Sequence, residues 1–250
     1  MQAIGELPPK RRLGRYAYPT SHRVIEIVAV VLFVGFGAAF AVQVTGGLLG
    51  SLDVATAVMT VLAVFSAVVA ADFASGLVHA LCDNLGSVDT PIVGQKFIRS
   101  FREHHTDPLD MTRGDFIRVN ADNFLICLPI LIPVTIWLDV EGHPFLATFL
   151  VSMMGFVVVT NQIHKWAHTA DVPRPIRWAQ AHRLILSPEH HRVHHTPPYD
   201  SHYCITSGIT NRFLTGIGFW PALMRVCHRV GRIGHHEAPA GARASARRHA

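Results

Sequence analysis

The side chains with the greatest chemical potential in this 250-residue chain are its 17 histidines, which are unevenly distributed. Eleven of them fall in two blocks, with three between residues 79 and 105 and eight between residues 164 and 202. Imidazole nitrogens are common metal ligands. Two dense blocks therefore indicate a metal site, whereas a lone histidine in such a chain is usually structural.

The spacing within the blocks suits helices that point several imidazoles in one direction. Residues four apart lie one above the other on a helix, and one His/Asp pair and one His/His pair have that spacing. The run HHRVHH adds an HxxHH arrangement and a further HxxxH pair that starts at His190, and REHH adds two adjacent histidines. The candidate ligands are eight imidazoles and one carboxylate: His79, Asp83, His104, His105, His164, His168, His191, His194 and His195.

This ligand set is too large for one tetrahedral zinc ion, which takes four ligands. It suits two metal ions with open coordination positions, and imidazole together with carboxylate is an acceptable ligand set for iron. The four cysteines are scattered without CxxC spacing, so we expect neither a thiolate zinc site nor a disulfide framework. The isolated histidines are expected to be structural: His22, His228, His235, His236 and His249.

Apolar segments must position these ligands. Half of the residues are apolar, only 16% are charged, and the mean hydropathy is +0.29, whereas a soluble domain carries about 25% charged residues. A membrane-spanning helix needs about 20 apolar residues. The candidate spans are Val24–Val44, Val54–Ala71, Phe124–Leu138 and Phe145–Thr160. We expect the two prolines of the third stretch to kink it, and the third and fourth stretches to be two spans rather than a re-entrant hairpin.

The charges predict the orientation of the spans. All 22 Lys and Arg residues fall at 1–23, 72–122 and 165–250, and the two connections 45–53 and 139–144 contain none. Both termini and the long central connection are therefore expected in the cytoplasm. The polar, basic start of the chain is not expected to be a cleaved signal peptide. The net charge of +5 fits this topology better than it fits nucleic-acid binding.

The expected fold class is all-α, an integral membrane bundle of four transmembrane helices capped by a cytoplasmic, helical, histidine-rich metal site. We expect a basic cytoplasmic segment at 1–23, a membrane domain at 24–222 and a basic, flexible tail at 223–250. Residues 205–224 are apolar, but Arg212 lies near their middle. This charge favours an interfacial segment over a fifth span.

Several motifs, in the same order, resemble those of a known family. ADFASGLVH, FREHHTDPLDMTRGDF, TNQIHKWAHT and SPEHHRVHHTPPYDSHYCITSGITN are similar to motifs of the plasmanylethanolamine desaturases. These enzymes belong to a wider lipid desaturase family, which includes a chloroplast enzyme that acts on an acyl chain of phosphatidylglycerol. The likeness runs from about Ala71 to Trp220, with gaps only across the third and fourth spans, and it identifies 24–222 as a lipid desaturase domain.

The resemblance implies an oxygen-dependent di-iron enzyme, an oxidoreductase of plasmalogen biosynthesis. Such an enzyme introduces the vinyl ether double bond between C1 and C2 of the sn-1 alkyl chain of an ether phospholipid. The nine candidate ligands are then the ligands of two iron ions, with O2 as co-substrate. FREHH and HHRVHH favour the plasmalogen branch. The alternative on the same scaffold is an acyl-chain desaturase or hydroxylase of a membrane phospholipid.

The reading also implies partners and a location. The substrate is a membrane phospholipid, and a separate electron donor (cytochrome b5-like, ferredoxin or similar) is required because the chain has no CxxCH, nucleotide-binding glycine loop or cysteine cluster. The Ala/Arg-rich composition favours a bacterial inner membrane with a cytoplasmic active site. The candidates for orienting ligand imidazoles, or alternatively for helix caps and surface positions, are Asp72, Asn161, His190, Asp107, Asp110, Asp115 and Asp122.

Two positions depart from the family pattern. Gly114 stands where the family usually has histidine in TRHDF, and Ala80 stands where a tryptophan usually follows the first histidine. Either the histidine absent at 114 is not an essential ligand, or this protein has another substrate or has lost activity. From a different class, a membrane metal transporter is disfavoured because the histidines cluster outside the apolar stretches rather than inside them.

Overall fold

The computed structural model describes residues 19–91 and 93–230, and every regular element in that part of the chain is helical. The all-α class is confirmed. Four of the described helices are long and apolar enough to cross a membrane, which confirms the predicted number of spans. These four helices are α1 (Thr20–Leu49), α2 (Val54–Asn84), α5 (Phe116–Trp137) and α6 (Pro144–Ala167).

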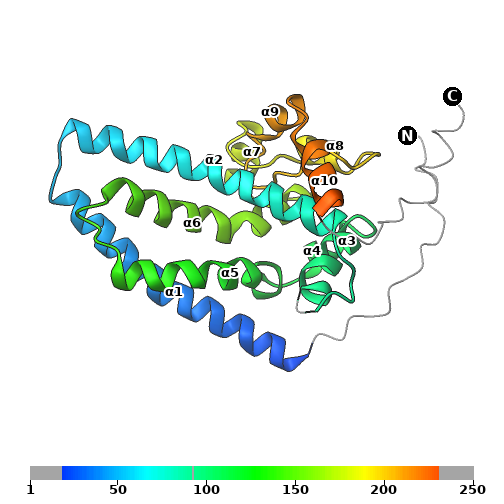
Figure 1. Ribbon diagram of the computed structural model, residues 1–250, viewed down its shortest axis with the longest axis horizontal. Helices are drawn as coiled ribbons and strands as arrows, with labels where there is room; N and C mark the ends of the chain where they lie inside the picture. Colours follow the sequence, from blue (N-terminus) through cyan, green and yellow to red (C-terminus); the bar gives the residue numbers. More distant parts are fainter. Residues whose placement is uncertain (1–18, 92, 231–250) are drawn as a thin grey trace, which may run out of the picture.

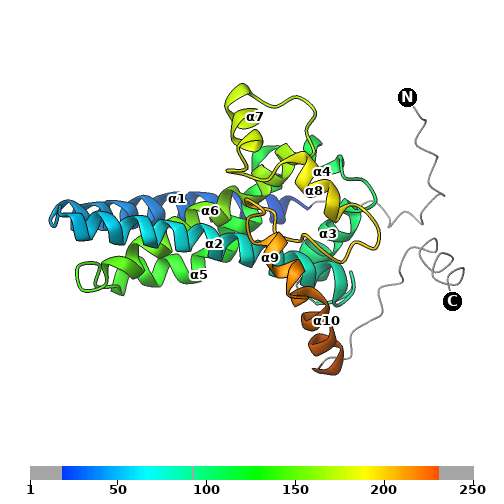
Figure 2. The same cartoon turned by 90° about the horizontal axis from the view of Figure 1, so that it is seen from above.

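The four long helices run side by side, and the short elements gather at one end of them (Figures 1 and 2). Helix α5 packs between α1 and α6, and α2 packs against the other side of α6. The short elements form a head on this bundle. They are η1 (Gly94–Ile98, a π-helix), α3 (Arg99–His104), α4 (Asp110–Arg113), α7 (Arg174–Ala181), α8 (Pro188–His194), α9 (Asn211–Gly216) and α10 (Phe219–Val230).

Side-chain caps set where several helices begin. The carboxylate of Asp53 accepts a hydrogen bond from the Thr56 N–H (2.7 Å) at the start of α2, and Asp115 accepts one from the Arg118 N–H (3.0 Å) at the start of α5. Ser187 caps α8, whose first residue is a proline. Each cap satisfies a backbone N–H that has no partner within the helix, so Asp115 has the capping role rather than a role beside the ligands.

The helices extend beyond the apolar runs of the sequence. Helix α2 continues past Ala71 to Asn84, and α6 continues past Thr160 to Ala167. Helix α5 begins at Phe116, before the predicted start, and passes through its two prolines as one helix. Because α2 and α6 stay helical past their apolar stretches, the histidines in their last turns are carried into the head.

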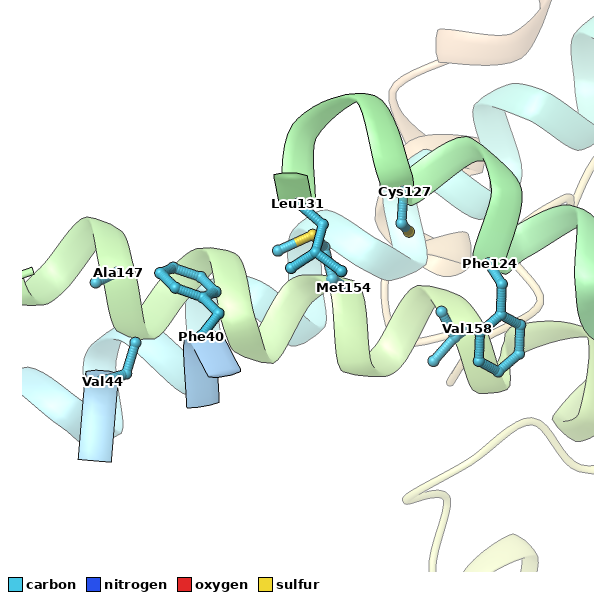
Figure 3. Packing of buried hydrophobic residues seen from close by; sticks show 8 residues of the cluster. All are labelled: Phe40, Val44, Phe124, Cys127, Leu131, Ala147, Met154 and Val158. Atoms are coloured by element: carbon cyan, nitrogen blue, oxygen red, sulfur yellow. The ribbon is translucent and has the colours of Figure 1, made fainter. Parts of the chain in front are cut away.

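An apolar core holds the bundle together (Figure 3). It is formed by α1, α5 and α6 through Phe40, Val44, Phe124, Cys127, Leu131, Ala147, Met154 and Val158. The outward faces of the long helices are also apolar, and side chains such as Val42 and Val61 are exposed. Lipid chains suit such a surface, whereas water does not. The bundle is therefore that of a membrane protein.

Some predicted regions extend outside the described residues. Residues 1–18 and 231–250 lie outside them. These two ranges contain most of the predicted N-terminal segment, most of the predicted tail, and His235, His236 and His249. Helix α10 runs across the boundary predicted at 222. Residues 205–224 form a largely buried loop, then α9 and the start of α10, instead of one spanning helix.

Candidate metal centre

All nine predicted ligands lie in the head, on the ends of four helices. Helix α2 carries His79 and Asp83 in its last turns, and α6 ends with His164 followed by His168 at its C-cap. Helix α3 ends with His104 and His105, and α8 carries the remaining three, His191, His194 and His195. Helices that are far apart in sequence thus present their ligands to one region of the molecule.

The ligands form two groups rather than one. The five-histidine group contains His104, His164, His168, His191 and His195, and the Asp83 group contains His79, Asp83, His105 and His194. Within each group, one ligand atom of every member lies within 4.8 Å of those of all other members. The groups are neighbours, since the ring centroids of His105 and His195 are 5.1 Å apart. This arrangement suits two metal ions close together.

Ring nitrogens converge in the five-histidine group. The Nε2 atom of His191 lies 2.8 Å from that of His164 and 3.0 Å from that of His195. The Nε2 atom of His195 also lies 3.1 Å from that of His104. A neutral imidazole has one N–H and one lone pair, so such a cluster offers several inward lone pairs to a cation.

The Asp83 carboxylate lies at the centre of the other group. Its Oδ2 atom lies 2.9 Å from His105 Nε2, 3.4 Å from His79 Nε2 and 3.5 Å from His194 Nε2. Asp83 is only 5% exposed. A carboxylate so deeply buried requires compensating charge, which a metal cation held by it and by these imidazoles would provide.

Buried polar atoms without a hydrogen-bond partner mark both groups within the described residues. They include His79 Nε2 and Asp83 Oδ1 in one group and His168 Nε2 in the other. Buried polar atoms in folded proteins nearly always have a partner, so each exception needs an explanation. Two metal ions would satisfy these atoms, and the residues therefore fit the predicted pair of ions.

Backbone carbonyls orient two imidazoles of the Asp83 group from behind. His79 Nδ1 lies 3.0 Å from the Tyr203 carbonyl oxygen, and His194 Nδ1 lies 2.9 Å from that of Ser201. A carbonyl only accepts, so Nδ1 carries the proton in both rings and Nε2 presents its lone pair to the group. Such outer partners fix the orientation of metal-binding histidines.

The segment that supplies these carbonyls is fixed to α2 by Asp72. The fully buried Asp72 carboxylate accepts hydrogen bonds from the N–H groups of Ser207, Gly208 and Thr210 and from the Thr210 hydroxyl, at 2.6–3.0 Å. Ser75 also accepts a hydrogen bond from the Ile205 N–H. Asp72 therefore acts on the ligands through this segment rather than by direct contact with an imidazole.

Two other residues predicted to orient ligand imidazoles, Asn161 and His190, form their hydrogen bonds with residues outside the two ligand groups. Asn161 donates to the Val119 carbonyl of α5 (3.0 Å), and His190 lies 3.0 Å from the Asn211 amide nitrogen. The sequence gives no sign of the Tyr203 and Ser201 carbonyls, since any residue type carries a carbonyl. Gly114 is not a member of either ligand group.

Burial favours the neutral form of His104, His168 and His191 by lowering the pKa of each ring. It lowers the pKa of His104 and of His191 well below the ordinary value of 6.5, and neighbouring imidazoles lower these pKa values further. Burial also lowers the pKa of His168 to about 4. Neutral rings keep the lone pairs that metal binding requires.

Comparison with known proteins decides the family. Residues 68–237 match the model of the lipid desaturase domain. The chain belongs to the lipid desaturase family. The chain is 40% identical over 210 residues to plasmanylethanolamine desaturase of Myxococcus xanthus. The aligned region covers 84% of this chain and 73% of the relative. Among solved structures, none matches the chain.

Two further relatives are a mouse enzyme and a plant enzyme. The chain is 42% identical over 172 residues to mouse plasmanylethanolamine desaturase 1, with 66% of this chain and 64% of the relative covered. It is 29% identical over 188 residues to chloroplastic fatty acid desaturase 4 of Arabidopsis thaliana, with 74% of this chain and 57% of the relative covered. The predicted family is confirmed, and the protein is an enzyme, an oxidoreductase that acts on lipids.

Proposed function

We propose that this lipid desaturase introduces the vinyl ether double bond between C1 and C2 of the sn-1 alkyl chain of an ether phospholipid, which gives a plasmalogen. The observation that carries the proposal is the convergence of eight histidines and Asp83 into two neighbouring groups. The Myxococcus and mouse relatives are plasmanylethanolamine desaturases, which supports this choice of substrate.

In this proposal each group holds one iron ion. Bound iron supplies the oxygen chemistry needed to remove hydrogen from an unactivated C–H bond, which acid–base groups cannot do. The inward Nε2 lone pairs and the Asp83 carboxylate hold the ions, and the Tyr203 and Ser201 carbonyls keep His79 and His194 in the ligating orientation. Most of the ligand side chains are buried, which limits the access of bulk water to the reacting carbons.

The reaction balances only with a separate electron donor. The alkyl chain loses two hydrogen atoms, O2 becomes two water molecules, and two electrons and two protons come from outside. A cytochrome b5-like protein, a ferredoxin or a similar carrier supplies the electrons in this proposal. The head lies on the cytoplasmic side, because the basic residues flank that end of the spans, and a bacterial inner membrane is the proposed location.

The test is expression of the chain in cells that make alkyl-ether phospholipids but no plasmalogens. Mass spectrometry of total lipids, before and after mild acid, measures the acid-labile vinyl ethers. Wild type is expected to form them, and His194→Ala, expressed at the same level, is expected to form none. A well-expressed, iron-loaded wild type without vinyl ethers would overturn the proposal.

The likeness to chloroplastic fatty acid desaturase 4 favours a second candidate, desaturation of a phospholipid acyl chain. The same lipid profiles separate the two functions. New double bonds in ester-linked chains that are stable to acid, with no vinyl ether, would select the acyl-chain reaction.

A further inference from the structure

A polar pocket adjoins the five-histidine group. Its volume is about 200 Å³, and it is lined by the ends of α1, α3, α5 and α6, by η1, and by residues 107–114. His104 and His164 form part of its wall. The pocket therefore reaches two of the predicted iron ligands.

The lining of this polar pocket is charged rather than apolar. Five carboxylates and three lysine or arginine side chains face it. A desaturase that acts deep in an acyl chain needs an apolar channel beside its metal, because many methylene groups separate the reacting carbons from the headgroup. In an alkyl-ether phospholipid only the glycerol backbone separates C1 from the phosphate. A charged pocket beside the ligands suits this second geometry.

Three groups of ion pairs, of different strength, line the polar pocket. Lys96 is well buried and lies 2.7 Å from Asp122 and 3.4 Å from Glu26. The mostly buried Arg99 lies 2.7 Å from Glu103. The Lys96–Asp122 and Arg99–Glu103 distances are short and both cations are largely buried, so these pairs are expected to persist when a ligand binds.

The third pair is different. Arg118 and Asp110 are 3.6 Å apart, and each side chain is more than half exposed. Asp110 also lies 4.0 Å from Arg113, whose closer partner is Asp107. Exposed ion pairs at such distances contribute little to stability. The pair is thus easily exchanged for a ligand that carries both charges.

We infer that the polar pocket binds the zwitterionic headgroup of the phospholipid, with Arg118 on the phosphate and Asp110 on the ammonium group. This inference rests on the proposed function. Arginine matches the phosphate oxygens with two parallel N–H donors, and a carboxylate suits a primary ammonium. The phosphate takes the place of Asp110 beside Arg118, and the ammonium group takes the place of Arg118 beside Asp110. Phe101, Met111 and Val119 supply apolar wall beside these charges.

The test compares Arg118→Gln and Asp110→Asn with a matched control. Arg177 and Asp171 form another exposed ion pair, 3.5 Å apart, away from the pocket lining. Arg118→Gln is expected to raise KM for an alkyl-ether phosphatidylethanolamine about tenfold with kcat little changed, because headgroup contacts are equal in the ground and transition states. Arg177→Gln is expected to leave both constants unchanged.

Headgroup choice tests the second half of the inference. Asp110→Asn is expected to reduce, by about fivefold, the preference for alkyl-ether phosphatidylethanolamine over alkyl-ether phosphatidylglycerol, which lacks the ammonium group. Asp171→Asn is the matched control and is expected to keep the preference. Equal preference ratios in the two variants would overturn the assignment of Asp110.

A binding measurement separates this inference from the proposed function. Titration of the metal-free full chain with diacyl phosphatidylethanolamine, and with soluble glycerophosphoethanolamine as competitor, needs no turnover. Competition by the soluble headgroup in wild type and in Arg177→Gln, but not in Arg118→Gln, supports the site. Equal binding by all three proteins overturns it, even where wild type makes vinyl ethers. A wild type that binds the headgroup but makes no vinyl ether overturns the proposed function alone.

Discussion

The two ligand groups are built differently, although they share α3 and α8. In the Asp83 group, carbonyls of the 201–203 segment hold two imidazoles from behind, and a carboxylate lies among the rings. The five-histidine group contains no carboxylate, and three close ring-nitrogen contacts run between its imidazoles, against one in the Asp83 group. One group is fixed by outer partners, and the other depends on the packing of α3, α6 and α8.

This difference gives the two groups different expected properties. The Asp83 group has four members and one negative charge, whereas the five-histidine group has five neutral members. Loss of one member leaves three ligands in the first group and four in the second. The Asp83 group is therefore expected to be the more sensitive to substitution, and variants can test each part of this contrast.

The largest effect is expected for Asp83→Asn. The amide is nearly the same size but removes the negative charge that offsets a bound cation, and its NH2 group places a donor among nitrogen lone pairs. We expect iron content to fall from two to about one ion per chain, with more than a hundredfold loss of activity. Elemental analysis of the purified protein and an assay of the lipid product measure these effects.

Asp83→Glu is the control for Asp83→Asn, because it keeps the charge. It is expected to retain more iron than the asparagine variant. Two full iron equivalents in Asp83→Asn would show that the carboxylate is not a ligand and would remove the contrast between the groups.

A smaller effect is expected for His168→Ala. His168 is the last member contributed by α6, and its loss leaves four imidazoles in the five-histidine group. We expect iron to remain near two ions per chain while activity falls about tenfold, in the range typical for weakened metal sites. His79→Ala, the matched change in the Asp83 group, is expected to lose one ion. Equal iron loss in the two variants would contradict the comparison.

The sequence predicts which side chains converge in the head better than it predicts how they are grouped. The pairs His79/Asp83 and His164/His168 share a group, as their i, i+4 spacing indicates. HHRVHH is read from the sequence as one face, yet the structure assigns His191 and His195 to one group and His194 to the other.

The physical reason is the turn of the helix. Adjacent residues on a helix point about 100° apart, so neighbouring histidines serve different groups. His104 and His105 divide in the same way as His194 and His195. The spacing alone cannot show this division, because it depends on how α3 and α8 face α2 and α6 across the head.

The spans are predictable because length and apolarity define them. The backbone carbonyls behind His79 and His194 are not, since they depend on the path of the 199–211 segment rather than on residue type. Ala80 shows the same limit. Ala80 is fully buried against a cluster that includes Tyr203 and Trp220. Other side chains of the fold thus fill the space that a tryptophan usually takes in the family.

The smallest effect is expected for Asp72→Asn, which acts on the Asp83 group through the segment behind it. Asp72 Oδ1 accepts from the Ser207 and Gly208 N–H groups, and Oδ2 accepts from Thr210. In the variant, the amide oxygen keeps the first two bonds and the Thr210 hydroxyl turns to accept from the NH2 group. The Thr210 N–H is left without a partner, at a cost of about 1–3 kcal/mol.

This local loosening is expected to shift the Tyr203 and Ser201 carbonyls and so to speed the release of one iron ion. Iron release to a chelator is then expected to have two phases, one for each ligand group. Asp83→Asn lacks the phase of the Asp83 group, and only that phase is expected to accelerate in Asp72→Asn, by a few-fold. Leu131→Ala is the control, because it removes buried bundle packing (Figure 3) and destabilises the protein by about 2–5 kcal/mol. If the control changes the same phase equally, general destabilisation explains the result and the outer support of the Asp83 group has no separate effect.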